Sequence, residues 1–327
     1  MRMENDRALD CAGAARLLGE WDQILLLCHA SPDGDTLGSA TALCRGLRAL
    51  GKTVNIDCAD PIPEKFQYLF EGLPQEEREP RYIVTVDVAD VKLLGAAWKK
   101  WGERADLAID HHGAREVFAP LRWVEPDSAA TAEMIFLLLE ELGAPVDPAT
   151  AGCVYTGIAT DTGCFRYRNV TPRTHRIAAR TLELGAAAGE INRRMFESKS
   201  RAQVEAERRV MEGMEFLCGG KAAMIQVPWK ILEETGTTES DLEGLASLPR
   251  QIQGVVVGIT LKERENGTVK ASVRADPPAN AAALCAKFGG GGHQGAAGCS
   301  FDKETIEQAA QAMGKACREY LESLGLL

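Results

Sequence analysis

The sequence predicts an α/β protein in which a domain built on a parallel sheet is joined by a helix to a smaller α/β domain. Over the first 190 residues, short apolar runs rich in Val, Ile and Leu alternate with helical patterns, as in successive βαβ units. A charged helical stretch follows, and a hairpin signal then marks a second group of strands. The length of 327 residues agrees with two domains.

The first domain is expected to contain a sheet that is covered on both faces, because its apolar runs are short and nearly continuous. The helix after the first strand ends at Gly51. Residues 151–161 are apolar and small, and their pattern does not distinguish strand from helix. The expected strands are Ile24–His29, Thr53–Cys58, Tyr82–Val88 and Leu107–Asp110, and the expected helices are Thr36–Leu50 and Ala130–Gly143.

The chain changes character near Ala186, where a long charged helical pattern begins. We interpret residues 191–215 as a connecting helix with a solvated face, between a first domain over 1–190 and a second domain over 216–327. The pair Asn266-Gly267 predicts a β-hairpin. The expected strands here are Ala222–Val227, Gly254–Lys262 and Thr268–Ala275, and the expected helices are Asn280–Phe288 and Lys303–Leu324.

Composition argues against several kinds of protein. The net charge of −10 disfavours binding to long duplex nucleic acid, which requires many phosphate contacts, but is compatible with a small phosphorylated ligand. No apolar run reaches the roughly 20 residues that span a bilayer, and residues 1–6 show no apolar leader. The ten cysteines form no C-x-x-C pair, which favours a reduced, cytoplasmic protein over a zinc ribbon.

Carboxylates and histidines gather at four points of the first domain, each at the end of an apolar segment. Three of the five histidines in the chain lie in these clusters. Because ligands bind beyond the carboxyl ends of parallel strands, we expect the clusters to share one site. The clusters are His29 with Asp33 and Asp35, then Asp87, then Asp110 with His111 and His112, and finally Asp161.

Some of these residues have an ordinary structural alternative. Asp35 could cap the following helix, and Asp161 alone would be a loop residue. Asp87, by contrast, interrupts an apolar strand, where a carboxylate is costly to bury unless it is paired or bound to metal. The side chains of His111 and His112 point in different directions, so one would bind metal and the other would face a substrate, with Asp110 orienting a ring.

Seven candidate ligands are too many for one ion. Two divalent ions bridged by one carboxylate, about 3.5–4 Å apart, would use them, and Asp87 is the expected bridge because it stands in the middle of the set. Mixed imidazole and carboxylate ligation favours Mn²⁺, Fe²⁺ or Zn²⁺ over Ca²⁺. Such a pair activates water and stabilises the oxygens of a transferring phosphoryl group.

The second domain carries four consecutive glycines followed by a histidine. Glycines let backbone N–H groups approach an anion closely, and His293 with Arg274 would add charge and donors. The alternative is a flexible hinge, which does not need a histidine at its end. The loop matches neither a P-loop nor a dinucleotide fingerprint. The glycines are Gly289, Gly290, Gly291 and Gly292.

In order along the chain, these motifs resemble those of the DHH phosphoesterase family. The glycines with His293 resemble the substrate loop of its DHH-associated C-terminal domain, so the match covers almost the whole chain. The compact length is similar to that of the stand-alone nano-RNase and pAp-phosphatase type. Ser128 lies in a further family-like segment and receives no chemical role. The motifs are His29 to Asp35, Asp87, Asp110-His111-His112 and Thr160 to Gly163.

The resemblance implies a role for each residue, with Mn²⁺ as the favoured metal. His112 would contact the scissile phosphate, with Asp110 beside it. Arg274, His293 and Asn280 would hold another phosphate or a terminal nucleotide. One ion would be bound by His29 and Asp33, the other by Asp35, His111 and Asp161, and Asp87 would be shared.

The implied activity is hydrolysis of very short oligonucleotides (nano-RNA) to 5′-mononucleotides, and of 3′-phosphoadenosine 5′-phosphate (pAp) to AMP. One alternative keeps the chemistry and changes the substrate to cyclic di-AMP or pApA. A less favoured one is a non-catalytic nucleotide sensor, which would be expected only if metal ligands were missing. By analogy with the family, a homodimer is also expected.

Overall fold

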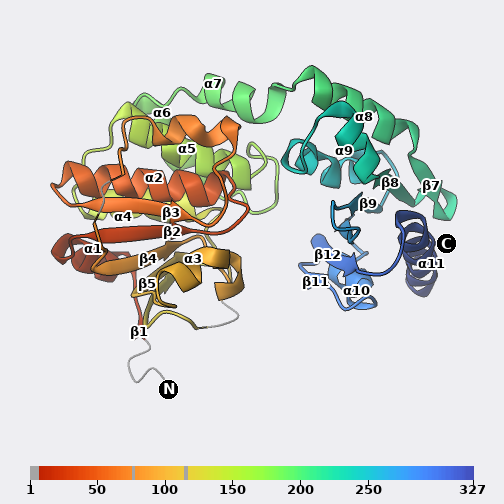
Figure 1. Cartoon of the computed structure of the whole chain (residues 1–327), viewed down its shortest axis with the longest axis horizontal. Helices are drawn as coiled ribbons and strands as arrows, with labels where there is room; N and C mark the ends of the chain where they lie inside the picture. The colour runs from red at the N-terminus through yellow and green to blue at the C-terminus, as the bar shows by residue number, and fades with distance from the viewer. Residues whose placement is uncertain (1–6, 76–77, 114–116) are drawn as a thin grey trace. The chain divides into compact units, whose positions relative to one another are not determined.

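The computed structural model describes residues 7–75, 78–113 and 117–327. The N-terminal stretch in which we found no apolar leader lies outside these residues. The chain divides into two compact units, Met1–Ser198 and Lys199–Leu327 (Figure 1). Each unit has hydrophobic clusters of its own. No described helix is both long enough and apolar enough to cross a membrane.

The first unit contains a parallel sheet, as predicted. In the described part of the chain it has six strands in the order β1-β6-β5-β4-β2-β3, and every neighbouring pair is parallel. The strands β3 and β4 lie on opposite sides of β2, so the strand order changes direction there. The strands are β1 (Arg7–Ala8), β2 (Ile24–Cys28), β3 (Val54–Cys58), β4 (Tyr82–Val86), β5 (Leu107–Asp110) and β6 (Leu121–Val124).

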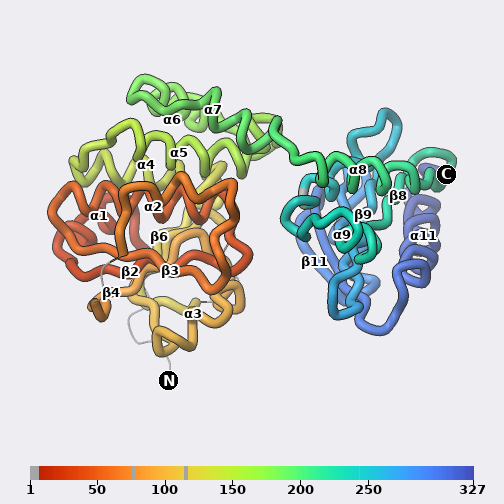
Figure 2. Tube along the Cα trace, turned by 45° about the horizontal axis from the view of Figure 1, so that its top comes forward, coloured from red at the N-terminus to blue at the C-terminus, as the bar shows by residue number. Residues whose placement is uncertain are grey.

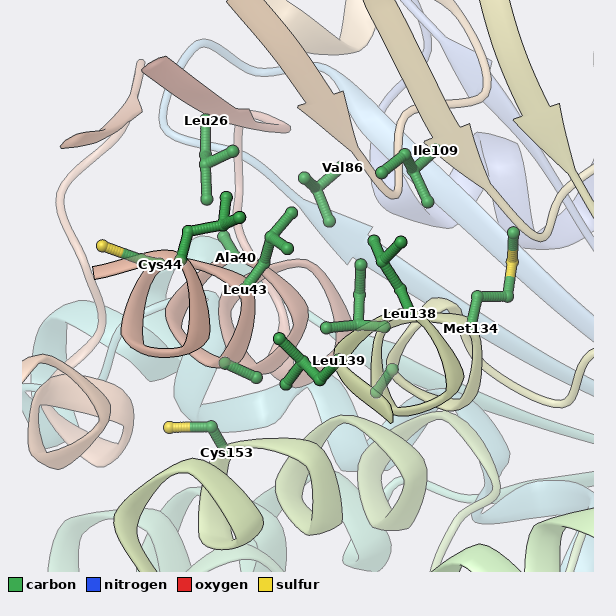
Figure 3. Close-up of a cluster of buried hydrophobic side chains, with 14 of the residues drawn as sticks. Leu26, Ala40, Leu43, Cys44, Val86, Ile109, Met134, Leu138, Leu139 and Cys153 are labelled. Atoms are coloured by element: carbon green, nitrogen blue, oxygen red, sulfur yellow. The ribbon is translucent and has the colours of Figure 1, made fainter. Parts of the chain in front are cut away.

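Helices cover both faces of this sheet (Figure 2). On one face, Leu26, Val86 and Ile109 of the strands pack against Leu43 of α2 and Leu138 of α4 (Figure 3). The other face is covered by η2 and α3. The helices of the unit are α1 (Cys11–Glu20), α2 (Gly34–Ala49), η1 (Glu64–Phe70), η2 (Val91–Leu94), α3 (Gly95–Lys100), α4 (Thr131–Glu141), α5 (Pro148–Asp161), α6 (Pro172–Glu183) and α7 (Ala188–Asn192).

The second unit contains a mixed sheet. Its described strands run in the order β11-β12-β10-β9-β8-β7, with β8 and β9 parallel and the other pairs antiparallel. The predicted hairpin is confirmed: β9 and β10 are joined by a turn in which Gly267 has a φ of 81°. The strands are β7 (Glu215–Leu217), β8 (Ala222–Val227), β9 (Val257–Glu263), β10 (Val269–Ala275), β11 (Gly291–Gly292) and β12 (Ala296–Phe301).

The single connecting helix predicted over 191–215 is wrong. A π-helical turn, η3 (Arg193–Glu197), follows α7, and a new helix, α8 (Arg201–Glu212), begins after Ser200. Ser200 and Gln203 form a capping box, a start signal that the continuous charge pattern obscured. Ala206 and Val210 of α8 are buried against β8, so this helix belongs to the second unit.

Two of the remaining described helices of the second unit were predicted, and the other four were not. The short helix before the glycine segment and the closing amphipathic helix are both present, and Asn280 and Thr305 are their N-caps. A cluster around Ile259, Val273 and Met313 forms the core between the closing helix and the sheet. These helices are α9 (Trp229–Thr235), η4 (Cys218–Gly220), η5 (Ser240–Ser247), η6 (Pro249–Gln251), α10 (Ala281–Ala286) and α11 (Ile306–Ser323).

Candidate metal centre

The carboxyl end of the first sheet positions most of the predicted ligands. His29 follows β2, Asp87 follows β4, and Asp110 is the last residue of β5. These three strands are neighbours, and β2 is where the strand order changes direction. Ligands bind at such a switch point in open α/β sheets because the loops on its two sides diverge. The order of the strands therefore puts His29 and Asp87 next to each other.

One predicted position needs correction, and one that the sequence left open is now determined. The strand β4 ends at Val86, so Asp87 lies just beyond it, in a left-handed conformation with a φ of 62°. Asp161 is the last residue of α5, so a helix end carries this carboxylate and not a strand end. The helix comes close because of Gly157, where a Cβ atom would lie 2.9 Å from an oxygen of Asp35.

His29, Asp33 and Asp87 form the first group of donors. The Nδ1 atom of His29 lies 2.9 Å from the carbonyl oxygen of Ala30 and donates its proton there. Its Nε2 atom lies 3.5 Å from Asp33 Oδ1 and 3.8 Å from Asp87 Oδ2. Because a ring nitrogen fixed in this way offers a lone pair, the group is suited to a cation.

His111, Asp35 and Asp161 form the second group. The Nδ1 atom of His111 donates to the carbonyl oxygen of Ser128 at 3.0 Å. Its Nε2 atom is buried and has no hydrogen-bond partner among the described residues. It lies 3.7 Å from both Asp87 Oδ1 and Asp161 Oδ2, and 3.9 Å from Asp35 Oδ2.

These distances are too long for hydrogen bonds and suit ligands that surround one ion. A buried lone pair that faces three carboxylates is repulsive unless a cation lies among them. Asp87 directs Oδ2 toward His29 and Oδ1 toward His111, so its two oxygens face different groups. The donor set therefore fits two divalent ions that share one carboxylate.

Burial and mutual repulsion raise the pKa values of three of these carboxylates. Burial raises the pKa of Asp87 well above its ordinary value, and the charges of Asp35 and Asp33 add to this. Burial and then the charge of Asp35 raise the pKa of Asp161 to about 7. Burial also raises the pKa of Asp35, although His111 opposes it. A divalent cation would remove this repulsion and keep the carboxylates ionised.

His112 lies beside both groups but has a different partner. Its Nδ1 atom lies 2.9 Å from Oδ1 of the buried Asp110. This hydrogen bond raises the pKa of His112, although burial opposes it. Nδ1 also lies 3.5 Å from Asp87 Oδ1, but a protonated nitrogen cannot bind a metal. The Nε2 atom of His112 is therefore the one that can face a substrate.

In the second unit, the glycine segment packs on the edge of the sheet. Gly289 and Gly290 donate their N–H groups to carbonyl oxygens of α10, and Gly291 pairs with Gly298 of β12. A Cβ atom at Gly290 would lie 2.2 Å from the carbonyl oxygen of Gly298, so only glycine fits. The expected anion cradle is thus wrong for the N–H groups of Gly289 and Gly290, and the segment is not a free hinge.

A pocket of about 650 Å³ lies beside this segment, over β10 and β12. Arg274 lines it with Gly289, Gly290 and Gly291, whereas Gly292, His293 and Asn280 are not part of the lining. Asn280 caps α10 by accepting the N–H of Ala283 at 3.2 Å. His293 is exposed in the turn after β11. Four of the seven predicted substrate-binding residues therefore line the pocket, and the other three do not.

Comparison with known proteins agrees with this geometry. A model of the DHH family N-terminal domain matches residues 23–158, and a DHHA1 domain model matches residues 218–319. The bifunctional oligoribonuclease and PAP phosphatase NrnA of Thermus thermophilus is 34% identical over 93% of this chain and 92% of its own. The chain belongs to the DHH phosphoesterase family.

Two further similarities extend over nearly full chains. The protein of the same name from Bacillus subtilis is 26% identical over 93% of this chain and 98% of its own. Among solved structures, an exopolyphosphatase-related protein from Bacteroides fragilis has a TM-score of 0.87 at 25% identity, covering 96% of this chain and 97% of that one. As a DHH phosphoesterase with these donor groups, the protein is a hydrolase that depends on divalent metal ions.

The start of α4 holds the ligands of this DHH phosphoesterase in place. The backbone N–H groups of Thr131 and Ala132 donate to Asp35 at 2.7 and 2.9 Å, and the Thr131 hydroxyl donates to Asp87 at 2.9 Å. Asp35 thereby caps α4, because Ala130, the residue just before this helix, has no side chain that can accept these hydrogen bonds. The alternative in which Asp35 caps α2 is wrong, because Asp33 has that position.

Arg173 supports the same segment and was missed in the sequence. Its guanidinium contacts Glu125 at 3.1 Å and Glu133 at 3.2 Å, and it donates to the hydroxyl of Ser128. Glu133 is fully buried in α4. A glutamate within so apolar a helix was the signal that could have located this network, since a buried charge needs a partner. Ser128, to which we assigned no chemistry, thus connects the network to His111.

Proposed function

We propose that the protein hydrolyses very short oligonucleotides to 5′-mononucleotides and converts pAp to AMP, with two Mn²⁺ ions. The observation that carries this proposal is Asp87, whose two carboxylate oxygens face different donor groups. When bound, two divalent ions supply an activated water and positive charge for the transferring phosphoryl group. One ion would be held by His29 and Asp33, the other by Asp35, His111 and Asp161, and both by Asp87.

His112 is proposed to act on the substrate directly. Its hydrogen bond to Asp110 raises its pKa and keeps Nδ1 protonated, so that Nε2–H of the imidazolium can donate to an oxygen of the scissile phosphate. Donation at that atom would stabilise the leaving oxygen as the ester bond breaks. Asp110 is buried and does not reach the substrate in this scheme, so it is a positioning residue.

Arg274 is proposed to bind a second phosphate, because it lines the pocket beside the glycine segment and its guanidinium recognises phosphate well. Gly290 and its neighbours keep the pocket wall close to the sheet. His293 follows them in the exposed turn and is a further candidate donor. Asn280 would act indirectly, through α10.

The relatives support this substrate class. The Thermus and Bacillus proteins are both named for oligoribonuclease and PAP phosphatase activity. A more distant relative, which is 25% identical and of which the match covers only 49%, is named as a cyclic di-AMP phosphodiesterase, so that alternative is not favoured.

The ten cysteines are unpaired, which supports our proposal of a reducing, cytoplasmic location.

A substrate panel with added Mn²⁺ tests the proposal. We expect fast hydrolysis of pAp and of oligoribonucleotides of two to five units, slow hydrolysis of a 24-mer, and little hydrolysis of cyclic di-AMP. The metal-free enzyme should be inactive and should recover with Mn²⁺. Equal rates on the short substrates and the 24-mer would contradict the short-substrate claim, and a preference for cyclic di-AMP would favour the alternative.

A further inference from the structure

The pocket of the second unit contains a second cation that the proposed function does not use. Lys270, Ser272 and Arg274 alternate along β10 with buried residues, so they lie on one face of the sheet, and all three line the pocket. Their partners on β12 are Ser300, Gly298 and Ala296. These residues are small, so the face between the two cations is open.

The charge of this pocket is opposite to that of the chain. No carboxylate is among the described residues that line it, although the net charge of the chain is −10. Lys270 is exposed, and in the described part of the chain it has no hydrogen-bond or ion-pair partner. Its ammonium group is therefore free to meet an anion without giving up another contact.

The spacing of the two cations points to two anionic groups. Lys270 and Arg274 are four residues apart on a strand, roughly 13 Å along its axis at the usual rise per residue. Two cations so far apart would bind different phosphates more readily than a single one. Phe288 also lines the pocket; its ring is half-buried against Phe301, and the part that remains exposed can contact a base. Phosphate, base and phosphate are the repeating parts of a single-stranded nucleic acid.

We propose that Lys270 binds an additional phosphate that is present only in substrates with at least three phosphate groups. This inference rests on the proposed function, in which the metal centre holds the scissile phosphate and Arg274 holds a second one. A substrate such as pAp or a 5′-phosphorylated dinucleotide has two phosphates, which the metal centre and Arg274 would bind, so no phosphate is left for Lys270. A 5′-phosphorylated trinucleotide has three, of which one is left for Lys270, so Lys270 sets the preference for length.

The experiment compares Lys270→Ala with wild type on pAp, on a 5′-phosphorylated dinucleotide and on a 5′-phosphorylated trinucleotide. We expect kcat/KM to fall about tenfold on the trinucleotide, the effect of one charge-assisted contact, and less than about twofold on the two smaller substrates. The salt dependence of KM for the trinucleotide should lose about 0.7 from its logarithmic slope, the value for one phosphate contact to a single strand. Lys270→Arg should retain both properties.

Lys315→Ala is the matched control, because Lys315 is exposed on α11 outside the pocket lining and its replacement changes the net charge equally. An unchanged trinucleotide rate in Lys270→Ala, or an equal loss on all three substrates in a folded variant, would overturn the inference. Both outcomes leave the proposed function intact. If wild type itself failed on every oligonucleotide and on pAp, the proposed function would fall instead.

Discussion

The Nδ1 atom of His111 donates to the backbone carbonyl of Ser128 at 3.0 Å, and this bond determines which ring nitrogen faces the carboxylates. A carbonyl oxygen can only accept, so the proton of the neutral ring is on Nδ1 and the lone pair is on Nε2. The ring of His111 is therefore oriented by Ser128, just before α4, and not by the carboxylates themselves. The second donor group is preformed for a cation.

Replacement of Arg173 tests this orientation. Glu133, the partner of Arg173, is 0% exposed. Arg173→Ala should therefore lower the free energy of unfolding by about 3 kcal/mol, because it leaves this buried carboxylate unpaired. It should also weaken Mn²⁺ binding roughly tenfold, as changes next to metal ligands do. Urea unfolding and isothermal titration calorimetry measure the two effects.

Arg180→Ala is the control on the same helix. Arg180 forms an ion pair with Glu183 in which both side chains are more than half exposed, so its loss should have little effect on either quantity. If the two variants were equally stable and bound Mn²⁺ equally well, Arg173 would not support the site.

Asp87 can be replaced by asparagine without changing the backbone, because asparagine tolerates the left-handed conformation found there. Asp87→Asn should reduce kcat by a factor on the order of 10³–10⁴, as loss of one member of a catalytic unit does. Calorimetry should show fewer than two bound Mn²⁺ ions per chain. The metal-free variant should melt a few °C higher than wild type, because a buried, repelled charge has been removed.

Asp90→Asn is its control, since Asp90 lies three residues further along and caps η2. It should retain activity and both ions. Normal turnover by Asp87→Asn would show that no shared carboxylate is required.

The metal-free protein should become less stable as the pH rises from 4 to 7. The pKa of Asp161 is raised from 3.8 to about 7 in the folded state, so over this range the folded chain holds a proton that the unfolded chain has released. Stability falls with pH wherever the folded state binds more protons. Above pH 6.5 the raised pKa of His29, where burial is outweighed by the nearby carboxylate of Asp33, acts in the same direction.

Saturating Mn²⁺ should flatten this dependence, because bound ions keep the carboxylates ionised. Urea unfolding at pH 5 and pH 8, with Mn²⁺ and with a chelator, measures the difference. The same slope in both conditions, or greater stability of the metal-free form at pH 8, would contradict the assignment of these carboxylates to a metal centre.

The pH profile of turnover should report the pair formed by Asp110 and His112. The Asp110→Asn variant loses the charge that stabilises the imidazolium, so the pKa of His112 falls. If protonated His112 acts on the phosphate, the decline of kcat on the alkaline side should move to lower pH. A reduced kcat with an unshifted alkaline limb would mean that Asp110 has only a structural role.

Much of this architecture was predictable because the signals are local. The strands β2, β4 and β5 are short apolar runs, and the Asn266-Gly267 turn determines a hairpin by its own backbone preference. The donors of the metal centre could be proposed because carboxylates and histidines at the ends of buried strands are costly to bury unless they are paired or bound to metal. The helix that carries Asp161 was ambiguous, since residues 151–159 are mostly apolar or small and are buried on every side.

What the sequence could not provide depends on contacts between distant segments. Asp35 caps α4, almost 100 residues further along, and no local pattern announces such a cap. Arg173 contacts Glu125 and Glu133, which lie 48 and 40 residues before it in the sequence. The break at Ser200 was hidden because the charged pattern continues on both sides of it. The glycines were predicted to bind an anion because the sequence does not show that they pack closely against Gly298 of a neighbouring strand.

The metal ligands come from separate stretches of chain between His29 and Asp161, and each donor group combines residues from at least two of them. The first group cannot assemble before β2 and β4 have packed, and the second cannot assemble before α5 has packed as well, so the ions cannot nucleate folding. We expect Mn²⁺ to leave the refolding rate unchanged and to slow unfolding. A cell starved of the divalent metal would then produce the folded enzyme at the usual speed but lose it faster to proteolysis.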